Sequence, residues 1–244
     1  MEAVHLPFYV PPMMRTRFIA FLLVPVLLTG CGRSASGQKP TPEQLSDALP
    51  TITDLAGGWE ETQRQIFDVR DVENPSLDPS IWCPEAIEVT KNLEDLAGQS
   101  GADVEMSIQQ SGQPTSLMRI QAWSNDDVDA YYGDAAEAAR ICDGKTTTDD
   151  AGVTSSTKLI AARDIGDESI SWSEETLPPS TTQSEKMAMI GRTTIARFGD
   201  ILMVAQIGTV DWTGDQVLMD EDQWWDIIEI AGKRLDQLDE QVHD

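Results

Sequence analysis

The sequence MAMIGRTTIARFGDILMVAQIGTV, residues 187–210, consists of two long apolar runs separated by a Gly-Asp pair. Glycine and aspartate are typical turn residues, because glycine tolerates unusual backbone angles and aspartate bonds to the nearby backbone. We therefore predict that residues 187–198 and 201–210 are two strands of a hairpin that turns at Gly199-Asp200.

A second hairpin is predicted nearer the N-terminus. Apolar and polar residues alternate over residues 104–109 and again over 118–122, a pattern typical of strands with one buried face. Residues 111–114, Ser-Gly-Gln-Pro, supply the turn between them. Shorter apolar segments at 158–161 and 170–172 predict two further strands.

Two amphipathic helices complete the predicted core. One follows the polar residues 124–127, which suit a helix N-terminus, and its apolar stripe includes Cys142. The other begins at Asp220 and has an apolar face made of Trp224, Ile227, Ile228, Ala231, Leu235 and Leu238. The order β-β-α-β-β-β-β-α predicts an α+β domain, an antiparallel sheet with helices packed on one face.

The first 30 residues are predicted to be a secretory signal peptide. A short basic stretch precedes an apolar run at 18–28, which at 11 residues is shorter than the roughly 20 needed to span a bilayer. Residues 1–12 contain no Lys or Arg and differ from the start of a signal peptide. We interpret them as a gene-start artefact, with Met13 or Met14 as the initiator.

The signal ends in Leu28-Thr29-Gly30-Cys31, which resembles the lipobox of bacterial lipoproteins. The resemblance implies diacylglycerol on the Cys31 thiol, cleavage just before this residue, and attachment to the outer face of the cell membrane. Residues 31–42 are mostly small and polar, which favours a flexible tether, and 43–244 are predicted to be globular. In the alternative interpretation, Cys31 is an ordinary cysteine after a secretion signal or inside a membrane anchor.

The predicted mature chain is strongly acidic. Residues 1–30 contain Arg15, Arg17 and Glu2, so the remainder keeps 15 basic and 41 acidic residues, a formal charge of −26. Such a charge argues against nucleic acid and against an electrostatic hold on anionic lipid or wall polymers. It indicates a well-hydrated surface, or alternatively an attraction for cations or a basic partner.

Three cysteines are present. If Cys31 is acylated, Cys83 and Cys142 remain as a pair in an oxidising compartment, where a disulfide is expected. Closing a loop of this length stabilises the folded state by about 4 kcal/mol in the chain-entropy model. The alternatives are two reduced thiols or a metal site, and a cysteine-bound metal usually needs more ligands than these two.

The sequence offers few candidates for catalysis. His243 is the one histidine of the predicted mature chain, so no Ser-His-Asp or Cys-His set and no histidine-bound metal is expected in the domain body. We predict no catalytic residue, no cofactor and no metal site. The acidic segment 211–215 lacks the ligand spacing of a calcium loop, which favours a solvated turn. Among 41 acids no carboxylate pair stands out, so a carboxylate-dependent enzyme stays as an alternative.

Seven tryptophans are the more unusual feature: Trp59, Trp82, Trp123, Trp172, Trp212, Trp224 and Trp225. Aromatic residues can line a pocket for lipid, glycan or peptide, but most large aromatics in strands and helices belong to the core. We expect exposure only for Trp212, in a polar turn, and for whichever of Trp224 and Trp225 faces away from the helix stripe.

Several short motifs between about residues 45 and 238 resemble a family of actinobacterial cell-surface lipoproteins with a PknH-like extracellular sensor domain. These motifs are Leu49-Pro50, Asp54-Leu55-Ala56-Gly57-Gly58-Trp59, Trp82-Cys83-Pro84, Ala138-Ala139-Arg140-Ile141-Cys142, Ile165-Gly166-Asp167-Glu168-Ser169 and Arg197-Phe198-Gly199-Asp200-Ile201-Leu202-Met203-Val204. The resemblance implies a disulfide-bearing α+β domain with a surface cleft and a ligand-sensing role. Two departures are the absence of a kinase domain, so that a partner would relay any signal, and one internal cysteine pair where the kinase sensor has two disulfides.

Together these features predict a membrane-tethered, non-enzymatic binding domain that captures a small molecule, a glycan or an envelope protein. No ligand-binding residue can be assigned from the sequence. The alternatives are a carboxylate-dependent cell-wall hydrolase and a structural accessory subunit of an envelope complex.

Overall fold

A computed structural model describes residues 39–55, 58–67, 83–86, 89, 101–110, 113–148, 150, 152–177, 188–211 and 221–243. The predicted signal peptide, Cys31, Trp82 and Trp212 lie outside these residues, as does most of the acidic segment 211–215. Among the described residues no helix is both long and apolar enough to cross a membrane.

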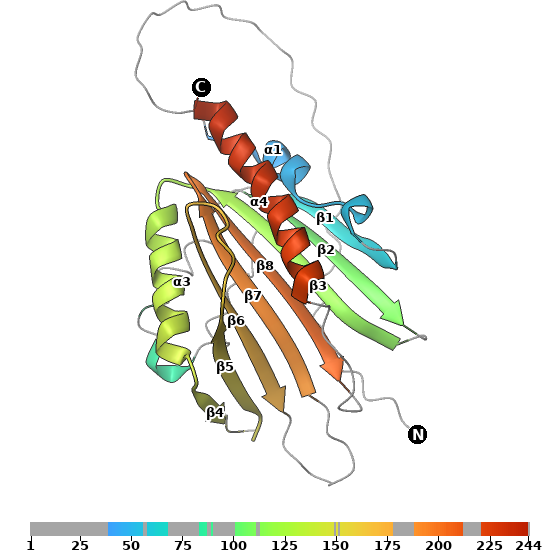
Figure 1. Ribbon diagram of the computed structural model, residues 1–244, viewed down its shortest axis with the longest axis vertical. Helices are drawn as coiled ribbons and strands as arrows, with labels where there is room; N and C mark the ends of the chain where they lie inside the picture. The colour runs from blue at the N-terminus through green and yellow to red at the C-terminus, as the bar shows by residue number, and fades with distance from the viewer. Residues whose placement is uncertain are drawn as a thin grey trace, which may run out of the picture. The chain divides into compact units, whose positions relative to one another are not determined.

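The described part of the chain forms one eight-stranded sheet in the order β1-β2-β3-β8-β7-β6-β5-β4 (Figure 1). Every neighbouring pair is antiparallel. The strands are β1 (Trp59–Phe67), β2 (Gly101–Gln110), β3 (Gln113–Ser124), β4 (Thr146–Thr148), β5 (Thr154–Ile160), β6 (Glu168–Leu177), β7 (Ala188–Phe198) and β8 (Ile201–Asp211).

Both predicted hairpins are present. β7 and β8 pair from Ala188↔Asp211 to Phe198↔Ile201 around the turn at residues 199–200, and β2 pairs with β3. The two hairpins join where β3 lies against β8, with residues 116–124 opposite residues 201–209. Since these strands are far apart in sequence, this contact ties the two halves of the chain together.

Three α-helices lie beside the sheet in the described residues: α1 (Pro42–Ala48), α3 (Val128–Cys142) and α4 (Glu221–His243). Two short 3-10 helices, η1 (Ile52–Asp54) and η3 (Pro84–Ala86), accompany them. α1 begins with a capping box, in which the Thr41 hydroxyl accepts from the Gln44 N–H at 3.3 Å and the Gln44 side chain accepts from the Thr41 N–H at 2.8 Å.

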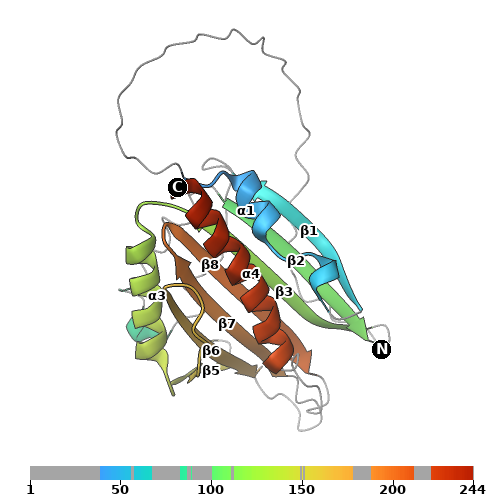
Figure 2. The same cartoon turned by 45° about the horizontal axis from the view of Figure 1, so that its top comes forward.

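The α+β class with one disulfide is confirmed, but the helices cover both faces of the sheet. One core cluster joins α1 and α4 to residues such as Ile120, Met203 and Ala205, whereas a second joins α3 to Leu202 and Val204. Figure 2 shows α1 and α4 lying over the same face. The expectation of a single covered face is wrong because the run 201–205 is continuously apolar, and a strand of this kind buries both of its faces.

Four of the five tryptophans within the described residues are buried, as expected, yet the predicted exposure of one member of the Trp224/Trp225 pair is wrong. Their side chains are 0 % and 2 % exposed. Trp225 lies under the Arg163 guanidinium, 5.8 Å from the ring centre, and donates a hydrogen bond to Glu221 at 3.3 Å. An arginine from the β5–β6 connection therefore covers the ring that the helix stripe alone would leave exposed.

Candidate functional site

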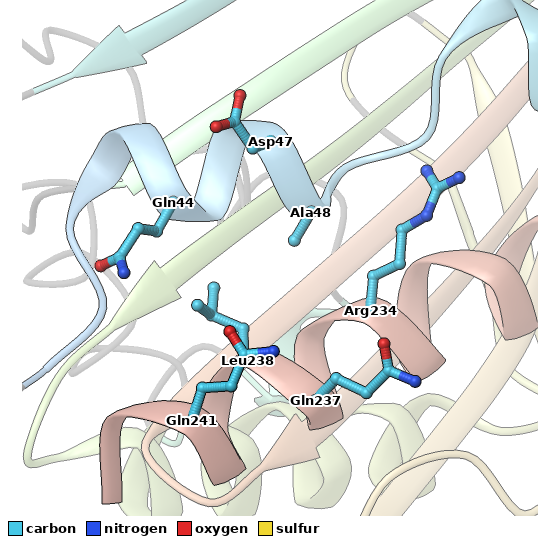
Figure 3. A pocket seen from close by; sticks show the side chains of 7 residues that line it. All are labelled: Gln44, Asp47, Ala48, Arg234, Gln237, Leu238 and Gln241. Atoms are coloured by element: carbon cyan, nitrogen blue, oxygen red, sulfur yellow. The ribbon is translucent and has the colours of Figure 1, made fainter.

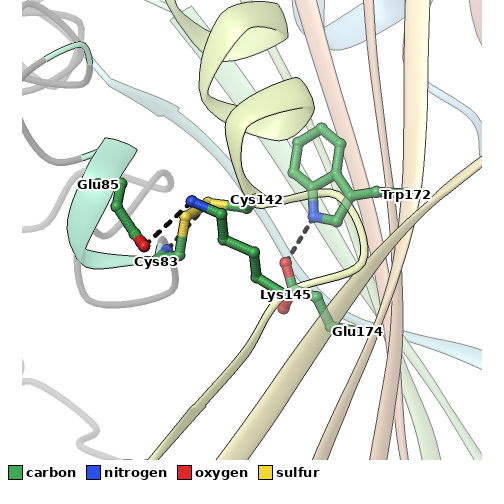
Figure 4. The surroundings of a disulfide bond; sticks show 6 residues. All are labelled: Cys83, Glu85, Cys142, Lys145, Trp172 and Glu174. Atoms are coloured by element: carbon green, nitrogen blue, oxygen red, sulfur yellow. Dashed lines mark hydrogen bonds and ion pairs between the residues drawn. A yellow bond between two sulfur atoms is a disulfide. The ribbon is translucent and has the colours of Figure 1, made fainter.

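The Cys83–Cys142 disulfide joins η3 to the last residue of α3 (Figure 4). Both cysteines are buried, and the Cys83 N–H lies 3.1 Å from the Cys142 sulfur. The Lys145 ammonium forms a 3.1 Å ion pair with Glu85 across the same junction. The covalent bond and the ion pair thus fix residues 83–86 against the C-terminal end of α3.

Trp172 and Glu174 of β6 lie next to this disulfide (Figure 4). The Trp172 ring is completely buried in the α3 cluster, and its Nε1 donates a 2.5 Å hydrogen bond to the Glu174 carboxylate. Burial raises the pKa of the Glu174 carboxyl, and the hydrogen bond from Trp172 offsets only part of that shift. A half-buried acid thus stands at the edge of the region that α3 covers.

Beyond this edge lies a row of four residues that we name the glycine strip: Leu117, Gly208, Gly191 and Glu174. They are successive cross-strand partners on β3, β8, β7 and β6, so they occupy the same face as Trp172. The two central positions are glycines, so no side chain of the strip itself covers the backbone of β7 and β8 there. Met189, next to Gly191 on the same face of β7, is 42 % exposed.

A separate groove of about 300 Å³ lies between α1 and α4, on the opposite face (Figure 3). Its lining is mostly polar and consists of Gln44, Asp47, Ala48, Arg234, Gln237, Leu238 and Gln241. Arg234, its one cation, is held by Asp54 through two hydrogen bonds of 2.8 and 2.7 Å. The groove thus presents three amide side chains beside the apolar Ala48 and Leu238.

Comparison with solved structures finds the crystal structure of the extracellular domain of PknH from Mycobacterium tuberculosis. The TM-score is 0.51 at 11 % sequence identity, over 84 % of this chain and 100 % of that domain. The fold of the chain is PknH-like. An uncharacterised protein from Mycobacterium smegmatis matches with a TM-score of 0.37 at 8 % identity, over 82 % of this chain and 96 % of that one. No protein-family model matches the sequence, and no curated protein matches it.

The PknH-like fold agrees with the fold that the sequence motifs imply. At 11 % identity the comparison concerns the fold and does not transfer residue roles.

The one histidine of the predicted mature chain lies at the end of α4, remote from the glycine strip. His243 Nδ1 is 2.8 Å from the Asp239 carbonyl oxygen, and Nε2 is 3.6 Å from Asp200 at the β7–β8 turn. Gly191 lies in β7 and Gly199 in the turn that follows it; the eight residues between them correspond to roughly 26 Å of extended chain. The imidazole is therefore out of reach of Glu174.

Carboxylates in the described residues gather mainly around arginines. Arg197 makes ion pairs of 3.2–3.3 Å with Asp129, Asp167 and Glu168. The two carboxyls with raised pKa values, Glu174 and Asp239, stand at opposite ends of β7 and do not form a pair. No group of three or more acidic, histidine or cysteine residues in the described ranges has the arrangement of a metal site.

Of the residues singled out in the sequence, the structure brings Cys83 and Cys142 together. The glycine strip and Glu174 were not predicted. The sequence signal that could have indicated them is a pair of isolated glycines, Gly191 and Gly208, inside the two strand segments. Such glycines often mark close approach by a ligand or another backbone.

Proposed function

We propose that the chain is a lipid-anchored, extracytoplasmic binding domain. In this proposal Cys31 carries the lipid, residues 31–42 form the tether, and residues 43–244 bind a small molecule, a glycan or an envelope protein without transforming it. The resemblance of residues 28–31 to a lipobox supports the anchor.

The glycine strip is the observation that carries the binding role. It is a side-chain-free floor with apolar groups and one half-buried acid at its edges, next to a covalently fixed helix end. A rigid site favours binding because the protein loses little conformational entropy when the ligand binds. The PknH-like fold adds support, since the solved relative is the extracellular part of a kinase.

The anchor is tested by replacing Cys31 with Ser. The full-length wild type is expected in the membrane fraction of the producing cells, and the Cys31→Ser protein in the soluble extracytoplasmic fraction. Mass spectrometry of the wild-type N-terminal peptide should show acyl groups on Cys31. Tight membrane association of the variant would contradict the anchor.

The binding role is tested with the purified mature domain, residues 32–244. Its thermal unfolding is measured with peptidoglycan fragments, wall glycans and dispersed lipids, and at least one class should raise the midpoint in a concentration-dependent way. No shift with any class and no partner crosslinked in cells would overturn the proposal. Turnover of labelled peptidoglycan that is lost in a single Asp or Glu variant would instead favour a hydrolase.

A further inference from the structure

Three buried polar atoms on the α3 face of the sheet have no hydrogen-bond partner in the described part of the chain. They are Asp103 Oδ1 on β2, and Gln121 Oε1 and Trp123 Nε1 on β3. Asp103 and Gln121 are direct cross-strand partners, and Trp123 follows Gln121 by two residues, so the three side chains share one face. These residues are 1 %, 3 % and 2 % exposed, and we name them the β2–β3 patch.

The unpaired atoms of the β2–β3 patch indicate a partner that the described chain does not supply. An unpaired polar atom is costly to bury, because it gives up its bonds to water and gains none in return. Native proteins pair the great majority of such atoms, so three neighbouring exceptions call for an explanation. A complementary group must donate hydrogen bonds to Asp103 and Gln121 and accept one from Trp123.

The charge of Asp103 is already balanced. Its Oδ2 accepts hydrogen bonds from Arg119, through Nε at 3.0 Å and Nη2 at 2.5 Å, and from Gln65 Nε2 at 3.2 Å. The remaining oxygen, Oδ1, therefore needs a hydrogen-bond donor and not a second cation. Since Gln121 and Trp123 are uncharged, the complementary group is neutral.

Aromatic surface borders one end of the patch. The rings of Phe67 and Trp123 lie 6.1 Å apart, and their residues pair with Gly101 from its two sides. A Cβ on Gly101 would lie 2.8 Å from the Phe67 ring, so the glycine allows this ring to reach Trp123. Phe67 is half-buried and keeps part of its surface free for apolar contact.

Two polar side chains connect the patch to solvent. Gln65 lies on the edge strand β1 and is exposed, and the Arg119 side chain is 35 % exposed. Both contact Asp103 only through Oδ2. Exposed side chains change rotamer within nanoseconds, so movement of Gln65 can admit a ligand to the patch.

We propose that the β2–β3 patch binds an uncharged sugar residue. A hydroxyl group both donates and accepts, so neighbouring sugar hydroxyls can serve Asp103 Oδ1, the Gln121 amide and Trp123 Nε1 together. The C–H face of the sugar ring packs against Phe67. This inference rests on the proposed function, because it names a ligand class for a binding site on the α3 face.

The probes are glucose, galactose, mannose, arabinose, N-acetylglucosamine and chitotriose, each titrated into the mature domain. Two-dimensional NMR follows the indole N–H signal of Trp123, which is assigned by its loss in Trp123→Phe. At least one probe should shift this signal in a saturable way. Binding by a monosaccharide indicates a free sugar as the ligand, whereas binding by chitotriose alone indicates a glycan chain; either result supports the inference.

Two variants remove the unpaired groups one at a time. Gln121→Leu should weaken the bound sugar at least tenfold, and the ligand-free variant should be no less stable than wild type, because an apolar group replaces an unpaired amide. An amide with a purely structural role would instead make Gln121→Leu less stable. Trp123→Phe keeps the aromatic ring, removes the donor, and should also weaken binding, which saturation-transfer NMR of the sugar measures.

Matched controls lie on the opposite face of the sheet. Trp224→Phe removes another buried indole whose Nε1 is unpaired in the described residues, and Gln237→Leu removes an amide from the α1–α4 groove. Both should bind the sugar as wild type does. If Gln121→Leu fails to fold, the comparison of Trp123→Phe with Trp224→Phe decides.

The inference is overturned if no saccharide shifts the Trp123 signal, as expected if ordered water alone occupies the patch. Equal affinity of wild type, Gln121→Leu and Trp123→Phe for a sugar would overturn it as well. A lipid or wall peptide that raises the unfolding midpoint without moving the Trp123 signal would leave the proposed binding function intact and exclude the β2–β3 patch as its site.

Discussion

Arg234 of α4 donates two hydrogen bonds to the Asp54 carboxylate, from Nη1 to Oδ2 at 2.8 Å and from Nη2 to Oδ1 at 2.7 Å. Asp54 also accepts hydrogen bonds from the backbone N–H and the hydroxyl of Thr51, at 2.8 and 3.1 Å. The pair joins η1, near the start of the domain, to its last helix. Both carboxylate oxygens are thus engaged in one fixed arrangement.

Replacing Arg234 with Ala is expected to lower the free energy of unfolding by about 1–2 kcal/mol, because paired charge-assisted hydrogen bonds are lost at a half-buried position. Arg234→Lys should recover less than half of this loss, since a lysine cannot engage both oxygens at once. Urea unfolding measures the effect. The control is Arg140→Ala, whose exposed ion pair with Glu137 spans 3.7 Å and should contribute little.

The same contact predicts a pH dependence. The hydrogen bond from Arg234 lowers the pKa of Asp54 below its usual value of 3.8. The stabilisation is therefore complete above the unfolded-state value and is lost as the pH falls below about 4 towards the folded-state pKa. The stability gap between wild type and Asp54→Asn should be larger at pH 7 than at pH 3. A gap that is constant with pH would show that the charge of Asp54 has no part in it.

The Cys83–Cys142 disulfide should contribute strongly to stability. A 59-residue separation corresponds to about 4 kcal/mol in the chain-entropy model. The double variant Cys83→Ser/Cys142→Ala should lose roughly 2–5 kcal/mol in urea unfolding. Adding a reductant should destabilise the wild type to a similar degree and leave the double variant unchanged. Equal stability of oxidised and reduced wild type would contradict this role.

Much of the fold follows from local patterns in the sequence, whereas the pairing of distant strands does not. Alternation identifies β2 and β3, and the apolar stripe identifies α4. The pairing of β3 with β8 depends on which apolar faces match in three dimensions. The residue pattern of either strand alone does not predict that partner. The short strand β4 (Thr146–Thr148) is polar throughout and gives no periodic signal.

The candidate site illustrates the same limit. Isolated glycines in strands indicate close approach to the backbone, but the sequence does not say which face is open. At Gly191 and Gly208 that depends on where α3 ends, at Cys142, and on the register that places both glycines opposite each other. The cysteine pair was predictable because a covalent bond needs only two partners in an oxidising compartment.

Gly166 is a position where any side chain should be costly. Its φ of +64° lies in the left-handed region, and an added Cβ would overlap the carbonyl oxygen of Arg197 and the ring of Phe198. Gly166→Ala should therefore destabilise by roughly 2 kcal/mol or more. Thermal unfolding measures it against Gly133→Ala, which sits in the interior of α3 with open space around it and should stabilise by about 0.5–1 kcal/mol. Equal effects of the two substitutions would refute the close packing around Gly166.

The end of α4 should respond to pH near neutrality. The Asp239 carbonyl accepts a hydrogen bond from His243, and the carboxylates of Asp239 and Asp200 lie nearby, so the pKa of His243 is raised above 6.5. Because the folded-state pKa is the higher one, the stabilisation is fully present below pH 6.5 and is lost as the pH rises through the folded-state value.

NMR titration of the imidazole protons in the native domain should therefore give a pKa above 6.5, and Asp200→Asn should move it downward. Amide hydrogen exchange in the last turn of α4 should be faster at pH 8.5 than at pH 6, after correction for the intrinsic rate. His243→Gln should remove this additional pH dependence because glutamine does not titrate. A native pKa at or below 6.5 would mean that the carboxylates of the β7–β8 turn and α4 do not stabilise the protonated imidazole.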